Sequence, residues 1–162
     1  MRGRVLVADD NAIVRRTLRH LLEEAGVADV DEAEDGWRAV SQAAERQPNV
    51  VILDLAMPRM DGLNAAREIS KLLPQTAILM YTMHWSPHLE LEAKRCGVRM
   101  LVSKAQSSVL LRAVKDLLGN KNNPAGVVEA VSVGALSGDK AQSRASDAPG
   151  PEPIKPKAVT EG

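Results

Sequence analysis

Acidic side chains follow two apolar stretches of this sequence, at the point where each stretch ends. Asp9 and Asp10 come directly after the run of residues 4–8, and Asp54 follows the run of residues 50–53. Continuous apolar runs bounded by turn residues are typical of strands that are buried on both faces of a parallel sheet. Open α/β sheets bind their ligands at the carboxyl ends of such strands. An isolated aspartate can also simply end its strand, so the interpretation depends on what else reaches the same edge.

Two further polar residues are expected at that edge. Thr82 ends the apolar run of residues 77–81, and Lys104 follows the run of residues 100–102. Crowded carboxylates repel one another, and their pKa values rise unless a cation compensates. Mg²⁺ binds carboxylate, water and phosphate oxygens, and Lys104 would add a second positive charge beside Asp54. An aspartate in these surroundings can attack phosphorus and form an acyl phosphate, with cation and hydroxyl groups stabilising the transferred group.

Helical periodicity fills the segments between the apolar runs. Strands are expected at residues 4–8, 30–33, 50–53, 77–81 and 100–102, and helices at residues 11–25, 37–46, 63–73, 87–96 and 108–119. Ser108 is the expected N-cap of the last helix. Strict alternation with helix-length connections predicts an α/β fold with a doubly wound, five-stranded parallel sheet.

Composition excludes several classes of function. The 162 residues are 44% hydrophobic but include no Phe, so the core must be built mainly from aliphatic side chains. Lys and Arg number 21, as do Asp and Glu, which gives no reason to expect electrostatic binding of nucleic acid or of a membrane. The single Cys96 rules out an intrachain disulfide and fits a reducing compartment. We therefore expect a cytoplasmic protein.

The chain divides at Gly119. Residues 1–119 account for all the predicted strands and helices, whereas residues 120–162 are rich in proline, including Pro149, Pro151 and Pro153. Such a composition predicts an extended, disordered tail. The tail lacks the paired helices of a helix-turn-helix, so direct binding of DNA is not expected.

Four motifs carry a resemblance to a known family. They are VLVADDN at residues 5–11, ILDLAMPRMDG at residues 52–62, MYT at residues 80–82 and VSK at residues 102–104. With their spacing, they resemble the receiver domains of two-component response regulators over essentially all of residues 1–119. The resemblance implies a flavodoxin-like (βα)5 fold and a stand-alone, single-domain regulator.

The resemblance also implies a role for each acidic residue. Asp54 would be the phosphoacceptor of a phosphorelay. It would receive its phosphoryl group from the phosphohistidine of a sensor histidine kinase or a histidine phosphotransfer protein. Asp10 would bind Mg²⁺ directly, Asp9 would act through a bound water, and Asp54 and the backbone carbonyl of Ala56 would be further metal ligands.

The remaining implied roles concern the response of the domain to phosphorylation. Thr82 would be the switch hydroxyl that turns toward the phosphoryl group, and Lys104 would pair with Asp54 and then with the phosphate. The domain would signal by a conformational change to a downstream protein, with a phosphorylation-dependent dimer left open. It would not be an enzyme beyond its own phosphorylation and dephosphorylation.

The sequence departs from the family at two positions. Leu101 stands where the family usually has Tyr or Phe, so the aromatic part of the usual switch is missing. Ala105 follows Lys104 where proline is common, which leaves the isomer of that peptide bond open. Ala56 and His84 lie two positions beyond Asp54 and Thr82, and we expect them to tune the access of water to the acyl phosphate.

A flavin-binding doubly wound domain is disfavoured, because no phosphate-cradling loop of glycine or hydroxyl residues follows residues 4–8. Two further alternatives remain from the residues alone. One is a phosphorylation-independent interaction module with a vestigial pocket. The intact set of pocket residues argues against it, namely Asp9, Asp10, Asp54, Thr82 and Lys104. The other is a phosphohydrolase that uses Asp54 as its nucleophile. It would need a second acid nearby, which the following Leu55 and Ala56 do not supply.

Overall fold

The computed structural model describes residues 3–119, in which five strands alternate with five helices. The strands are β1 (Arg4–Ala8), β2 (Asp29–Ala33), β3 (Val50–Leu53), β4 (Ala77–Thr82) and β5 (Val98–Ser103). The helices are α1 (Ala12–Glu24), α2 (Gly36–Arg46), α3 (Gly62–Leu72), α4 (Pro87–Arg95) and α5 (Ser107–Gly119). The predicted tail of residues 120–162 lies outside the described residues.

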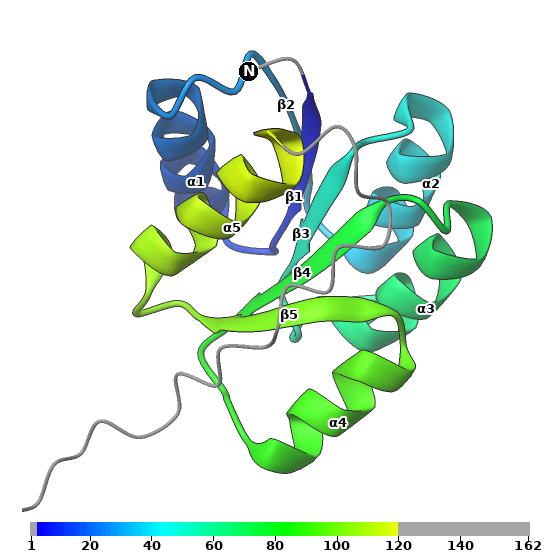
Figure 1. Ribbon diagram of the computed structural model, residues 1–162. Helices are drawn as coiled ribbons and strands as arrows, with labels where there is room; N and C mark the ends of the chain where they lie inside the picture. Colours follow the sequence, from blue (N-terminus) through cyan, green and yellow to red (C-terminus); the bar gives the residue numbers. More distant parts are fainter. Residues whose placement is uncertain (1–2, 120–162) are drawn as a thin grey trace, which may run out of the picture. The chain divides into compact units, whose positions relative to one another are not determined.

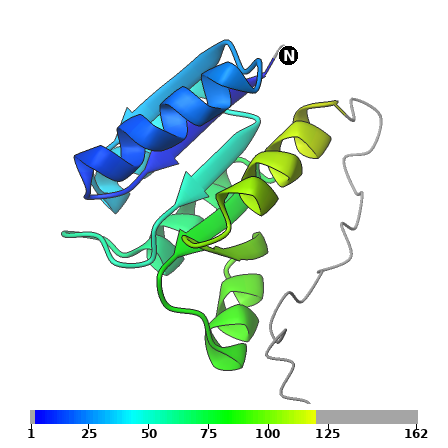
Figure 2. The same cartoon turned by 90° about the vertical axis from the view of Figure 1, so that its left-hand side faces the viewer.

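All neighbouring strands are parallel, in the order β2-β1-β3-β4-β5. Helices α1 and α5 cover one face of the sheet, and α2, α3 and α4 cover the other (Figure 1). The pair α1 and α5 faces the viewer in Figure 2. The predicted doubly wound α/β fold is therefore confirmed. The strand order reverses direction between β1 and β3, and this is the place where such sheets bind their ligands.

Each face of the sheet has its own apolar core. Val7 of β1, Ile52 of β3 and Leu110 of α5 belong to the cluster on the face covered by α1 and α5. Leu6 and Leu53 belong to the cluster on the opposite face. Neighbouring residues of one strand alternate between the two clusters, as the two-residue period of a strand requires. This burial on both faces explains why the strands appear in the sequence as continuous apolar runs.

Polar side chains cap the first four helices. Asn11, Asp35, Asp61 and Ser86 each accept a hydrogen bond from a backbone N–H of the helix that follows. The predicted cap Ser108 is wrong, because α5 already begins at Ser107. None of the helices in the described part of the chain is long and apolar enough to cross a membrane.

Candidate functional site

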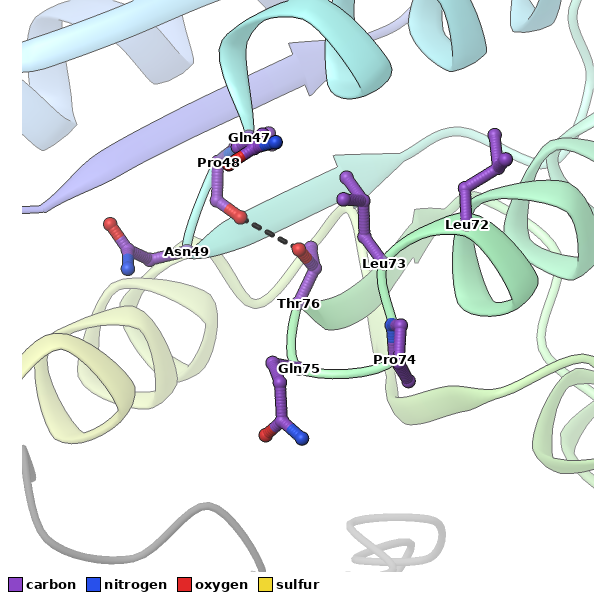
Figure 3. Close-up of a pocket in the computed structure, with 8 residues that line it drawn as sticks. All are labelled: Gln47, Pro48, Asn49, Leu72, Leu73, Pro74, Gln75 and Thr76. Carbon is purple, nitrogen blue, oxygen red and sulfur yellow. Dashed lines mark hydrogen bonds between the residues drawn. The ribbon is translucent and has the colours of Figure 1, made fainter.

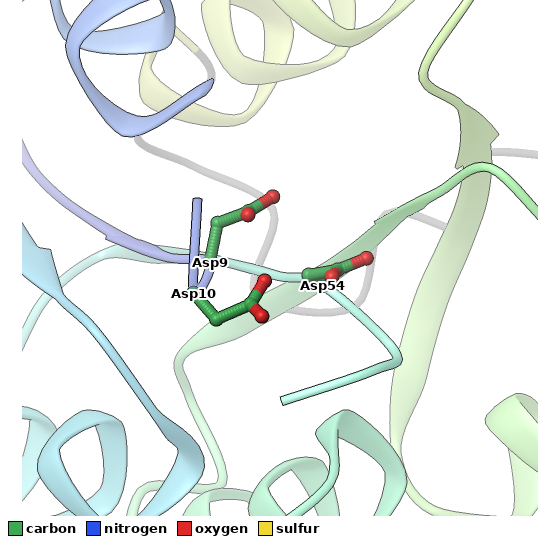
Figure 4. Close-up of side chains that lie close together, drawn as sticks. All are labelled: Asp9, Asp10 and Asp54. Carbon is green, nitrogen blue, oxygen red and sulfur yellow. The ribbon is translucent and has the colours of Figure 1, made fainter. Parts of the chain in front are cut away.

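Three carboxylates meet at the carboxyl ends of β1 and β3. Asp9 and Asp10 directly follow β1, and Asp54 directly follows β3, the neighbouring strand. Each can contribute one oxygen to a set in which all the oxygens lie within 4.8 Å of one another, and Figure 4 shows the three side chains. Asp9 and Asp54 are buried, whereas Asp10 is exposed to solvent. The structure thus brings together the three acids that the sequence placed at one edge of the sheet.

Lys104 supplies a cation to the two buried acids. Its Nζ lies 2.6 Å from Oδ2 of Asp9 and 3.3 Å from Oδ1 of Asp54. Only 13% of the Lys104 side chain is exposed. The long side chain therefore reaches from the end of β5 across β4 to the ends of β1 and β3.

The electrostatics of the site favour a further cation. Burial raises the pKa of the Asp54 carboxyl above its ordinary value, and the charge of Asp9 raises it further, whereas Lys104 partly offsets both effects. Burial alone would lower the pKa of Lys104, but its hydrogen bond to Asp9 and the charges of Asp54 and Asp9 raise it overall. The ammonium group of Lys104 thus pairs with two of the three acids. Carboxylate oxygens in this number suit a hard divalent ion such as Mg²⁺.

The backbone around Asp54 requires a glycine at the start of α3. The N–H of Asp54 donates to the carbonyl of Ala8 at 2.8 Å, and the N–H of Gly62 donates to the carbonyl of Leu55 at 2.9 Å. A Cβ on Gly62 would lie 2.1 Å from the carbonyl oxygen of Asp54. Because only glycine permits this approach, the loop after β3 can fold back against the residue that ends the strand.

Thr82 lies at the end of β4, between the strands that supply Asp54 and Lys104. It is buried, and its Oγ1 accepts a hydrogen bond from the backbone N–H of His84 at 3.1 Å. The side chain of His84 is exposed, as is Ala56 in the loop after β3. The predicted tuning residues thus lie in the two loops that follow β3 and β4.

The structure shows the surroundings of Leu101 and Ala105, the two residues that depart from the family pattern. Leu101 is half-buried and packs against the apolar cluster on the side of α2, α3 and α4. The peptide bond between Lys104 and Ala105 is trans, as are all the others within residues 3–119.

The hydroxyl of Tyr81 makes two polar contacts that sequence reasoning missed. Its ring is buried in the cluster on the side of α1 and α5. Its hydroxyl donates to the carbonyl of Lys104 at 2.9 Å and lies 2.8 Å from the hydroxyl of Ser107. A tyrosine in a buried strand could have indicated such a contact, because a buried tyrosine usually has a hydrogen-bond partner for its hydroxyl.

Asp35 and Arg59 form a second missed contact. Asp35 is fully buried, and its carboxylate accepts hydrogen bonds from the backbone N–H of Arg38 and from the guanidinium of Arg59. Burial alone would raise the pKa of Asp35, but these hydrogen bonds and the charge of Arg59 lower it overall. In the sequence, an Asp-Gly pair ahead of a helix indicates that the aspartate caps the helix. It does not indicate that Arg59 is a second partner of the same carboxylate.

A separate cavity of about 320 Å³ lies at the opposite edge of the sheet. It is lined by residues that precede β3 and β4, among them Pro48, Leu72 and Pro74 (Figure 3). Since β3 and β4 run away from it, this cavity is remote from the three acids and belongs to a different part of the molecule.

Comparison with known proteins agrees with this geometry. The family model of the response regulator receiver domain matches residues 5–115. The chain belongs to the response regulator receiver family. The chemotaxis protein CheY of Bacillus subtilis is 32% identical over 119 residues, which cover 73% of this chain and 99% of that protein. The crystal structure of a LuxR-family two-component response regulator from Aurantimonas sp. SI85-9A1 matches with a TM-score of 0.68 and 33% identity, covering 72% of this chain and 86% of that one.

Some relatives of this receiver are much longer proteins. A protein-glutamate methylesterase/protein-glutamine glutaminase of Hahella chejuensis is 42% identical over 82 residues, which cover 51% of this chain but only 23% of that protein. The chain thus spans about a quarter of this relative. Receiver domains generally bind Mg²⁺ at an acidic pocket, and the cluster of Asp9, Asp10 and Asp54 has the donor atoms for such a site.

Proposed function

We propose that this receiver accepts a phosphoryl group on Asp54 from the phosphohistidine of a sensor histidine kinase or a histidine phosphotransfer protein. The observation that carries the proposal is the position of Lys104, whose Nζ lies 2.6 Å from Asp9 and 3.3 Å from Asp54. A lysine held between two buried carboxylates keeps a positive charge beside the oxygen that would receive the phosphoryl group. This charge would favour the approach of the anionic donor.

The proposed step forms one bond and breaks one. A carboxylate oxygen of Asp54 attacks the phosphorus, and the electron pair of the P–N bond remains on the departing imidazole nitrogen. The product is an acyl phosphate. Lys104 then pairs with a phosphoryl oxygen in place of the Asp54 carboxylate. Transfer of this kind depends on positioning and charge more than on proton chemistry, and these residues supply both.

Mg²⁺ would be held by Asp9, Asp10, Asp54 and the backbone carbonyl of Ala56, with Asp9 acting through a bound water. When bound, the ion neutralises charge on the carboxylates and on the phosphoryl oxygens. The donor atoms fit this role, because the three carboxylates can place their oxygens within 4.8 Å of one another.

The output of the proposed switch starts at Thr82. Its hydroxyl accepts a hydrogen bond from the N–H of His84, and its own O–H would donate to a phosphoryl oxygen once the side chain turns toward it. That movement would change the loop after β4 and bias the domain toward a second conformation. Leu101 would accompany it by repacking rather than by swinging an aromatic ring. We propose protein partners as the readers of this state, with the domain not acting as an enzyme on other substrates.

The test is phosphorylation of the full chain with acetyl phosphate, followed by intact-mass measurement with and without Mg²⁺. We expect a labile mass gain of one phosphoryl group that needs Mg²⁺ and is absent from Asp54→Ala. Asp116→Ala is the matched control, because Asp116 is an exposed aspartate on α5 and far along the chain from the acidic site.

Two results would contradict the proposal. No mass gain in a folded wild-type protein would favour a phosphorylation-independent interaction module. Sustained hydrolysis of a small phosphoester, lost in Asp54→Ala, would favour a phosphohydrolase.

A further inference from the structure

The backbone of Lys104 is held on both sides by consecutive residues of β4. Its N–H donates to the carbonyl of Thr82 at 2.9 Å, and its own carbonyl accepts a hydrogen bond from the hydroxyl of Tyr81 at 2.9 Å. Tyr81 is the chain's single tyrosine. Because its ring is buried between the sheet and the α1–α5 layer, its hydroxyl has a fixed position.

This fixed hydroxyl also reaches the start of α5. It lies 2.8 Å from Oγ of Ser107, the first residue of that helix. Between the two anchor points, the chain passes through Ala105, which is exposed. One hydroxyl thus contacts both ends of this short loop, the carbonyl of Lys104 and the side chain of Ser107. The loop is also held by Ser103, whose Oγ accepts from the N–H of Ala105 at 3.3 Å and whose carbonyl accepts from the N–H of Gln106 at 2.8 Å.

The position of the Lys104 ammonium depends on this anchoring. The side chain is long and flexible, and it crosses β4 to reach Asp9 and Asp54. A displacement of the Lys104 backbone would shift the point from which the side chain reaches the two acids, so Nζ could keep both contacts only if the side chain changed its conformation. Positioning errors of about 1 Å are enough to slow a reaction greatly.

We propose that Tyr81 is a positioning residue for phosphoryl transfer, which it serves by fixing the backbone of Lys104 so that the ammonium group stays beside Asp54. This inference rests on the proposed function, since it assigns a further residue to the same site. Tyr81 does not touch the acids itself. Its ring lies on one face of the sheet, whereas Leu101, which occupies the family's usual aromatic position, packs on the other.

The test is Tyr81→Phe in the full chain, which keeps the ring and removes only the hydroxyl. We expect phosphorylation by acetyl phosphate at saturating Mg²⁺ to slow by about five- to tenfold, the factor that accompanies loss of one ordinary hydrogen bond. The affinity for Mg²⁺ should not change, because Asp9, Asp10 and Asp54 are intact. Hydrogen exchange of the Lys104 and Gln106 amides should become faster, while exchange in β3 stays as in the wild type.

Ser107→Ala is the matched control. It removes the other partner of the Tyr81 hydroxyl but leaves the bond to the Lys104 carbonyl in place. We expect its phosphorylation rate to be close to that of the wild type. A wild-type rate in Tyr81→Phe would overturn the proposal, and so would an equal loss of rate and Mg²⁺ affinity, because that would indicate general damage to the site.

Amide exchange separates failure of this inference from failure of the proposed function. If the wild-type protein takes up no phosphoryl group, the proposed function fails, whereas the anchoring by Tyr81 is still judged by exchange. Unchanged exchange of the Lys104 and Gln106 amides in Tyr81→Phe would then overturn the anchoring as well. Faster exchange at these two amides alone would support it.

Discussion

The guanidinium of Arg59 pairs with the fully buried carboxylate of Asp35 and so joins the loop after β3 to the start of α2. The backbone of Arg59 is in the left-handed region, with φ of 65°. A Cβ on the neighbouring Gly36 would lie 2.2 Å from the carbonyl oxygen of Met60. The loop that carries Ala56, the proposed carbonyl ligand, is therefore packed against α2 and held by an ion pair whose carboxylate is buried and whose guanidinium is partly exposed.

Asp35→Asn should destabilise the fold in a pH-dependent way. The pKa of Asp35 is below its ordinary value of 3.8 in the folded protein, so its stabilising effect is complete above that value. The effect is lost as the pH falls through the lower, folded-state pKa. Near neutral pH we expect a loss of about 1–2 kcal/mol in the free energy of unfolding, since Arg59 is partly exposed and screened. Urea denaturation should show this difference shrinking in acid.

The control for this prediction is Asp61→Asn. Asp61 caps α3 in the same manner, but no ion pair to an arginine is found for it among the contacts of residues 3–119. A difference between wild type and Asp35→Asn that stays constant down to acid pH would contradict the prediction.

Gly62→Ala should damage both the stability and the phosphorylation of the domain. The added Cβ would lie 2.1 Å from the carbonyl oxygen of Asp54, so the backbone that carries the phosphoacceptor must shift. We expect a loss of about 1–3 kcal/mol in the free energy of unfolding, the usual cost of overpacking. Denaturant unfolding and the acetyl phosphate reaction would measure the two effects.

Gly119→Ala is the matched control for Gly62→Ala. A Cβ on Gly119 would meet nothing within 4 Å, so both properties should remain those of the wild type. If the two alanine variants behave alike, close approach to Asp54 is not the reason for the glycine.

Lys104→Met should be least stable when Mg²⁺ is absent. The methionine keeps an apolar stem of similar length but leaves Asp9 and Asp54 without their cation. Removing one partner of a largely buried ion pair should lower the free energy of unfolding by about 1–3 kcal/mol, allowing for the remaining exposure of the site. Added Mg²⁺ should restore part of the loss, and thermal unfolding with and without the ion would measure it. Lys71→Met is the control, because Lys71 is paired only at the exposed surface.

Asp10→Asn should weaken the binding of Mg²⁺ without unfolding the domain. Asp10 is exposed, so the substitution leaves no buried charge unpaired. Loss of one charged oxygen ligand should lower the affinity by at least about tenfold, as even outer-shell substitutions do. Isothermal titration with MgCl₂ would measure this change, with Asp116→Asn as the control. An unchanged affinity would remove Asp10 from the proposed ligand set.

Sequence reasoning succeeded where a residue's place follows from its position along a strand. Asp9, Asp54 and Thr82 each come at the end of an apolar run, and parallel strands bring such ends to one edge. Their meeting could be expected without knowing any side-chain contact. The fold itself followed from the alternation of apolar runs and helical periodicity.

Sequence reasoning failed where a side chain contacts a loop far away along the chain. The partners of Asp35 and of Tyr81 lie more than 20 residues away along the chain, as the separations of 24 and 23 residues show. Neither pairing follows from local periodicity, because it depends on where the loops after β3 and β5 lie once the sheet has formed. The start of α5 was also misplaced, because the carbonyl of Gln106, which precedes Ser107, accepts the first backbone hydrogen bonds of the helix, from the N–H groups of Val109 and Leu110.

Substitutions at Ala56 and His84 should change the lifetime of the acyl phosphate in opposite directions. Both side chains are exposed in the loops that follow β3 and β4. A larger residue in Ala56→Met would obstruct water and slow hydrolysis several-fold, whereas His84→Ala would uncover the phosphoryl group and speed it. The backbone N–H of His84, which donates to Thr82, is kept in the alanine variant. Phosphate release after removal of acetyl phosphate would measure both rates, with the exposed His88→Ala as control. Wild-type rates in both variants would show that these two loops do not control access of water to Asp54.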